Sequence, residues 1–234
     1  MSKNNQNTGN PLSFIKEDAG HLLREGQFGA ILAGAGEGKT SFLMHLALDN
    51  LLSGKNVLHI CLGQPVKKVC LWYEEVLHRI SDQYELNNTN VMWEMILPHR
   101  FIMTFNVEDF SVKRLEERLN DLTEQGVFFP QAVLLDGLPF NETVRESLSE
   151  LKEMSRKHGF RVWFTVTTHR EDSVEQPDDI PSPISYMSDL FDVIVQLKPV
   201  GREISVQLIK GQKADKVPPL ILDPATQLIK NREQ

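Results

Sequence analysis

Cysteine, long apolar runs and basic charge are all scarce in this sequence of 234 residues. The two cysteines, Cys61 and Cys70, are too few for a disulfide framework, and both lie in apolar runs, so we expect buried, reduced thiols. No apolar stretch reaches the roughly 18 residues that a membrane-spanning helix needs. The N-terminal segment also lacks the apolar core of a secretory signal. These absences predict a cytoplasmic protein without a membrane span.

Positive charge is in the minority, with 25 Lys and Arg against 32 Asp and Glu, a formal net charge of −7. Because such a protein repels phosphates, a nucleic-acid partner is not expected. The remaining composition, 41% hydrophobic and 24% charged, is that of an ordinary globular protein. The polar, Asn-rich segment 1–12 predicts a disordered tail, and residues 13–234 are expected to form a single domain.

Short apolar runs alternate with longer amphipathic segments from Phe28 onward. The runs are continuous in hydrophobicity, which is typical of parallel strands buried on both faces. Helical periodicity marks 65–100, 111–125 and 141–158, and the last has Asn141 as a candidate N-cap. Gly159 is the matching candidate C-cap. The predicted strands are 28–33, 56–62, 101–106, 132–136 and 161–167.

The chain changes character after these strands. The polar, acidic segment 167–187 contains several prolines and predicts a long surface loop. Two strand-like stretches then flank Val200-Gly201, a signal for an antiparallel hairpin, and the segments PLILD and QLIK predict further short strands. The whole pattern predicts an α/β sandwich whose sheet is mostly parallel, with antiparallel strands at one edge.

The most informative motif is a glycine-rich turn at 33–40 that lies between a predicted strand and a predicted helix. It matches the phosphate-loop pattern, except that Ala33 replaces the first glycine. Glycines allow backbone N–H groups to face an anion, and the helix N-terminus adds positive potential. Lys39 would reach the β- and γ-phosphates, and the Thr40 hydroxyl would hold Mg²⁺; the alternative is a turn with an incidental Lys-Thr pair. The expected phosphate-binding residues are Gly34, Ala35, Gly36, Glu37, Gly38, Lys39, Thr40 and Ser41.

Two other predicted strands end in polar side chains. Asp136 ends the run AVLLD, where ligands of parallel sheets bind, and it could hold Mg²⁺ directly or through water. Alternatively, it opens an Asp-Gly turn. Thr167, Thr168 and His169 end the next strand, where they could sense a γ-phosphate, position a catalytic water or merely cap the strand. His169 has no second metal-ligating residue at a suitable spacing, so it is not predicted to bind a metal.

The order of these motifs over residues 14–230 resembles that of the RecA-type ATPases, most closely the KaiC, RadA and DnaB-helicase branch. The phosphate loop, the strand ending in Asp136, the VWFTVTTH strand, the long loop and the hairpin follow in the order of that family. The resemblance implies a RecA-like three-layer sandwich that binds ATP and Mg²⁺ at the strand tips. It also implies that Lys210, on the hairpin, faces the γ-phosphate of a neighbouring subunit.

The sequence departs from this family where hydrolysis would be catalysed. Gly63 and Gln64 stand where family members usually carry a Glu that activates water. Gln64 could orient a water in a catalytic role, but an amide is not a base. Gln212 replaces the arginine expected two residues after Lys210. The pair Glu74-Glu75 could substitute for the missing acid, although a solvated helix face explains it more simply.

We therefore expect an ATP-binding protein that hydrolyses slowly or only with a partner, as a nucleotide-dependent switch. Its partners would be the nucleotide and a protein, either a different one or a second copy of this chain. A DNA-directed recombinase or helicase accessory is the main alternative, but the acidic segment 171–179 would repel DNA. A phosphate-loop kinase would use an arginine-rich lid, and the long loop carries Arg170 alone. An interaction protein that had lost its nucleotide would not need an intact loop together with Asp136.

Overall fold

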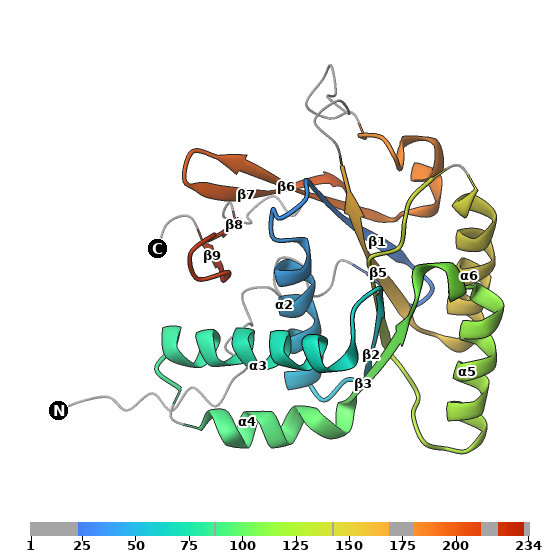
Figure 1. Ribbon diagram of the computed structural model, residues 1–234, viewed down its shortest axis with the longest axis horizontal. Coiled ribbons are helices and arrows are strands. Elements are labelled where there is room, and N and C mark those ends of the chain that lie inside the picture. The colour runs from blue at the N-terminus through green and yellow to red at the C-terminus, as the bar shows by residue number, and fades with distance from the viewer. Residues whose placement is uncertain (1–22, 87, 142, 169–179, 212–219, 232–234) are drawn as a thin grey trace.

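The computed structural model describes residues 23–86, 88–141, 143–168, 180–211 and 220–231. Within these ranges nine strands form one continuous sheet (Figure 1). The predicted tail, 1–12, lies outside the described residues. The strands are β1 (Phe28–Ala33), β2 (Val57–Leu62), β3 (Arg100–Phe105), β4 (Ala132–Asp136), β5 (Arg161–Thr167), β6 (Val193–Val200), β7 (Glu203–Lys210), β8 (Leu220–Leu222) and β9 (Ile229–Asn231).

The sheet has the order β3-β2-β4-β5-β1-β6-β7-β8-β9. Strands β1 to β6 pair in parallel, and the pairs β6–β7, β7–β8 and β8–β9 are antiparallel. The prediction of an α/β fold with a mostly parallel sheet and antiparallel edge strands is therefore confirmed. The five predicted parallel strands lie within one residue of their observed bounds, because continuous apolar runs bounded by polar residues specify buried strands well.

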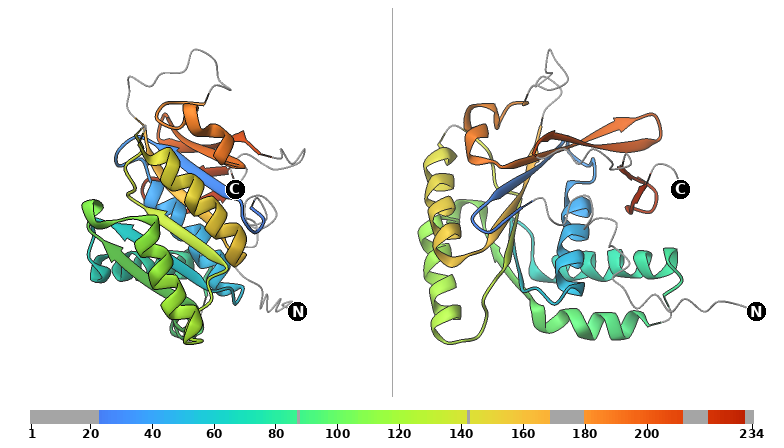
Figure 2. Two further views of the ribbon diagram at one scale, coloured as in Figure 1. Left: turned by 90° about the vertical axis from the view of Figure 1, so that its right-hand side faces the viewer. Right: turned by 180° about the vertical axis from the view of Figure 1, so that it is seen from behind.

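Helices cover both faces of the sheet (Figures 1 and 2). On one face lie α2, α3 and α4, and on the other lie α5 and α6. The described helices are α2 (Lys39–Leu52), α3 (Val66–Gln83), α4 (Thr89–Ile96), α5 (Val112–Glu124) and α6 (Val144–His158), with the 3₁₀ turns η2 (Leu97–His99), η3 (Val107–Asp109) and η4 (Ser185–Leu190). Among these described segments, no helix has both the length and the apolar composition needed to cross a bilayer.

Strand residues alternate between two hydrophobic cores. In β1, Ile31 packs toward the core of α2 and α3, whereas Ala30 and Leu32 pack toward the core of α5 and α6. Both sets are fully buried, so the strands read as continuous apolar runs rather than alternating ones. On α3, Tyr73 and Ile80 are buried in the first core at helical spacing.

Two details differ from the sequence predictions. Helix α6 begins at Val144 with Thr143 as its N-cap, so the prediction of Asn141 as the cap is wrong. Asn141 instead accepts hydrogen bonds at Oδ1 from the backbone N–H and the hydroxyl of Thr143, which is a local turn. Gly159 caps the C-terminus with φ +71°, as predicted. The predicted loop at 167–187 includes the start of η4, and its residues 169–179 lie outside the described ranges.

Candidate functional site

The carboxyl ends of β4, β5 and β1 are neighbours in the sheet, and the chain leaves them on opposite faces. After β1 it continues into α2, whereas after β4 it continues into α6 on the other face. Such a switch in direction opens a crevice at the carboxyl ends, where open α/β sheets bind their ligands. The candidate site lies in this crevice.

Residues 34–38 form a glycine loop between β1 and α2. Gly36 and Gly38 have φ values of +77° and +87°, a left-handed conformation that glycine adopts without strain. Gly38 is also the N-cap of α2. The backbone N–H of Gly34 donates to Glu37 Oε2 over 2.7 Å, so this N–H already faces a carboxylate. One backbone N–H of the loop is therefore bonded to an anionic group beside the N-terminus of α2.

Lys39 folds back over the glycine loop. Its ammonium donates to the backbone oxygens of Ala33 and Gly34 over 3.0 and 2.6 Å. Burial lowers the pKa of Lys39, while the charges of Asp136 and Glu37 oppose that shift. A positive charge is thus held at the loop by weak backbone acceptors, from which an anionic ligand could draw it.

Asp136, at the end of β4, accepts hydrogen bonds from two hydroxyl groups. Thr40 Oγ1 donates to Asp136 Oδ2 over 2.9 Å, and Thr165 Oγ1 donates to Oδ1 over 2.5 Å. Thr165 in turn accepts the N–H of Gly137 over 3.1 Å. The first turn of α2 is thereby joined to β4 and β5, and three oxygen-bearing side chains gather at one point. Hydroxyl and carboxylate oxygens are the ligands that Mg²⁺ prefers, so this oxygen set fits such an ion.

Two cavities meet at the glycine loop. The Asp136 cavity, of about 550 Å³, also contains Lys39, Thr165 and Thr167 in its walls. The Trp72 cavity, of about 340 Å³, is lined by Lys39, Thr40 and Ser41. The side chains of α3 and the β8–β9 hairpin that also line it are Trp72, Glu75, Val76, Arg79 and Gln227. An elongated ligand with a charged and an apolar end could therefore extend from one cavity across the loop into the other.

The β8–β9 hairpin packs against the glycine loop and α2. Ser41 Oγ donates to the backbone oxygen of Gln227 over 2.7 Å, and the N–H of Ile229 donates to His45 Nε2 over 3.4 Å. Burial lowers the pKa of His45 to about 4, so the ring is neutral and can accept this bond. Leu222 packs against Gly38 closely enough to leave no room for a Cβ atom there.

Other predicted site residues lie elsewhere. Gln64 accepts a hydrogen bond from Lys68 over 2.8 Å and lines a separate groove of about 1200 Å³ beside β3 and α5. Lys210 donates to the backbone oxygen of Ser188 over 2.8 Å, within the same chain. His169 and Gln212 lie outside the described residues, so their predicted roles have no structural account.

Sequence reasoning missed Thr165 and the three side chains Trp72, Arg79 and Gln227. A hydroxyl within the apolar run of β5, two residues before Thr167, was the available signal for Thr165. Nothing local in the sequence singles out Gln227, because it reaches the site through the pairing of β8 and β9.

Comparison with models of known protein families and with curated protein sequences finds no match to this chain.

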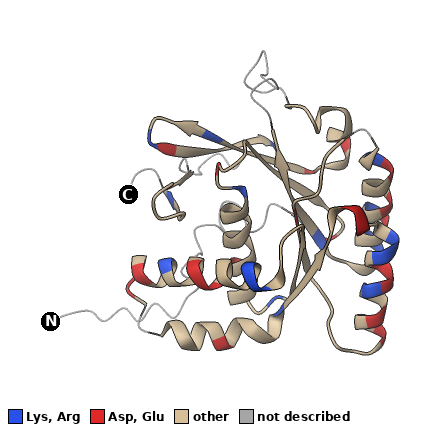
Figure 3. Cartoon of the chain, viewed as in Figure 1, with Lys and Arg blue, Asp and Glu red and all other residues tan. Residues whose placement is uncertain are grey.

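Charges of both signs are mixed on the two helices α5 and α6. On α5 and α6, Lys and Arg alternate with Asp and Glu, and no basic stripe forms on these helices (Figure 3).

Proposed function

We propose that the protein is a RecA-like ATP-binding protein that hydrolyses ATP slowly or only with a partner, and so works as a nucleotide-dependent switch. The observation that carries the proposal is the hydrogen bond between Thr40 and Asp136, which join the site from positions 96 residues apart. It brings the motif Gly38-Lys39-Thr40 beside an acidic strand end, the arrangement that holds Mg²⁺ and phosphates in phosphate-loop NTPases.

The surrounding cavities support a nucleotide as the ligand. The phosphates would bind the N–H groups of the glycine loop and the ammonium of Lys39, with Mg²⁺ between Thr40 and Asp136. The base would then lie in the Trp72 cavity, where an indole ring and the Arg79 guanidinium offer stacking surfaces. A bound ion would neutralise charge on the phosphates, and these residues would orient the nucleotide.

The experiment is calorimetric titration of the purified chain with ATP and Mg²⁺. The parent protein should bind, and Lys39→Ala should weaken binding by at least about tenfold because the phosphates lose their cation. Lys113→Ala is the matched control, since it removes an exposed lysine on α5 that lines neither cavity at the glycine loop. Absence of binding at millimolar ATP, or equal affinity in Lys39→Ala and the parent, would contradict the proposal.

A further inference from the structure

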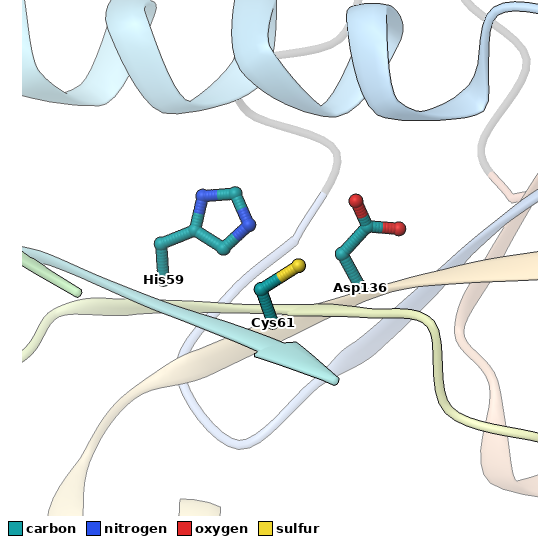
Figure 4. Close-up of side chains that lie close together, drawn as sticks. All are labelled: His59, Cys61 and Asp136. Atoms are coloured by element: carbon teal, nitrogen blue, oxygen red, sulfur yellow. The ribbon is translucent and has the colours of Figure 1, made fainter. Parts of the chain in front are cut away.

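Three potential metal ligands converge on one face of the sheet, toward α2 and α3. His59 and Cys61 are two residues apart on β2, so their side chains share a face, and Asp136 is the register partner of Cys61 on β4. One ligand atom from each residue lies within 4.8 Å of the other two. Figure 4 shows the imidazole, the thiol and the carboxylate side by side above the strands.

His59 carries an unpartnered nitrogen at this point. The residue is fully buried; its Nδ1 lies 3.1 Å from the hydroxyl of Tyr73, and its Nε2 has no hydrogen-bond partner among the described residues. In Figure 4 that nitrogen is on the side of the ring nearer Cys61 and Asp136. A buried polar atom without a partner costs free energy, so the position calls for an explanation.

We propose that His59, Cys61 and Asp136 bind a thiophilic divalent transition-metal ion of the Zn²⁺ class. One imidazole nitrogen, one sulfur and one carboxylate oxygen are ligands that Zn²⁺ accepts together, and three protein ligands leave a fourth position for water. Mg²⁺ would not use the sulfur, so this site differs in chemistry from the oxygen set of Thr40 and Asp136. The proposal does not rest on nucleotide binding, because none of its three ligands requires a nucleotide to be in place.

Tyr73 would orient the imidazole ring of His59 without binding the ion itself. With the ion on Nε2, the proton of His59 must lie on Nδ1, which then donates to the Tyr73 hydroxyl. Burial, reinforced by the positive charge of Arg100, lowers the pKa of His59 to about 3. The ring is therefore neutral at pH 7 and offers a lone pair. Such outer partners orient the ring and typically contribute ~10–100-fold in metal affinity.

Two costs accompany binding. Metal–ligand bonds of about 2.0–2.3 Å place tetrahedral ligand atoms within roughly 4 Å of one another, so any pair that lies near the 4.8 Å limit must move closer. Burial, and then the charge of Asp136, also raises the pKa of Cys61 to about 12, so the ion must displace the thiol proton to solvent as the metal–sulfur bond forms. Both Asp136 oxygens accept hydroxyls, but each carboxylate oxygen keeps a second lone pair for an ion. Of the three ligands, Asp136 alone lines a cavity among those described above, so an entering ion would reach this carboxylate first.

The test is titration of the metal-stripped, full-length chain with Co²⁺ in the absence of nucleotide, followed by competition with Zn²⁺. The parent should bind one equivalent and develop the near-ultraviolet band of a cobalt–thiolate bond, and Zn²⁺ should displace the cobalt with a dissociation constant below about 1 µM. Cys61→Ser should lose the band. Cys70→Ser, which changes the other free cysteine, should keep it. Tyr73→Phe should weaken Zn²⁺ binding by ~10–100-fold.

A parent protein without the thiolate band would overturn the proposal, as would a Cys61→Ser variant that binds Zn²⁺ as tightly as the parent. Circular dichroism and the thermal midpoint of each variant establish that it is folded. If Cys61→Ser does not fold, His59→Gln replaces it, with the same loss expected. Since this titration contains no nucleotide and the ATP titration contains no transition metal, failure of one proposal leaves the other standing.

Discussion

Gly38, in the glycine loop, packs against Leu222 of β8. Both its φ of +87° and its contact with Leu222 disfavour a side chain at this position. Gly54, with φ +71°, has open space around it among the described atoms. Gly38→Ala should therefore lower the free energy of unfolding by about 1–3 kcal/mol more than Gly54→Ala, because only the first variant adds an overpacking cost to backbone strain.

Urea unfolding of the two variants measures this difference. Gly54→Ala is the control for the positive φ, which the two positions share. Equal midpoints would mean that Leu222 moves aside without cost, and that β8 does not press on the loop.

At the scale of single elements, the β8–β9 hairpin carries an ion pair that titrates in acid. Lys230 Nζ donates to Asp223 Oδ2 over 2.8 Å, and both side chains are 26% exposed. This bond is the largest cause that lowers the pKa of Asp223 from 3.8 to about 2. Because the folded-state pKa lies below the unfolded one, the contribution to stability is complete above about pH 4 and disappears as the pH falls toward 2.

Lys230→Met should lower the free energy of unfolding by about 1–2 kcal/mol at neutral pH, after allowance for solvent screening. The difference from the parent should shrink as the pH falls from about 4 to about 2. Lys157→Met is the control, because its pair with Glu116 is well exposed and should contribute little. Thermal midpoints measured across this range decide the matter, and a difference independent of pH would contradict the assignment to Asp223.

Elements with a local signal were predictable, and those fixed by distant contacts were not. The strands β1 to β5 follow from apolar runs, and the turn at 34–38 from its glycines, because those signals are contained in consecutive residues. The meeting of Thr40 with Asp136 required the strand order, which periodicity does not supply. Trp72 belongs to the predicted helical segment 65–100, but its position in a cavity with Gln227 depends on the distant β8–β9 hairpin.

At the scale of the whole molecule, the two described side chains that were predicted to assist hydrolysis, Gln64 and Lys210, line neither cavity at the glycine loop. Gln64 lines the groove beside β3 and not the two cavities at the glycine loop, and the Lys210 ammonium is bound to Ser188. A general base typically contributes ~10²–10⁴-fold. We expect the isolated protein to turn over ATP far more slowly than about ten times per second, the median for enzymes.

Steady-state phosphate release by the purified chain tests this expectation, with Lys39→Ala as the background control. Turnover near the enzyme median would contradict the switch proposal. Gln64→Glu should leave the rate unchanged, because Gln64 lines the separate groove and not the cavities at the glycine loop. Gly63→Glu is a poorer test, because Gly63 has φ +74°, where a side chain is strained.

The glycine loop and α2 are contacted by three residues from the end of the chain, Leu222, Gln227 and Ile229. These contacts have a consequence for folding during synthesis. The glycine loop leaves the ribosome early, but the residues that secure it follow only after roughly 190 more have been added. At ~5–20 residues per second that interval is about 10–40 s. During synthesis, the glycine loop and α2 are therefore made well before the residues that contact them from the β8–β9 hairpin. A chain stalled before Leu222 would contain the glycine motif without these stabilising contacts.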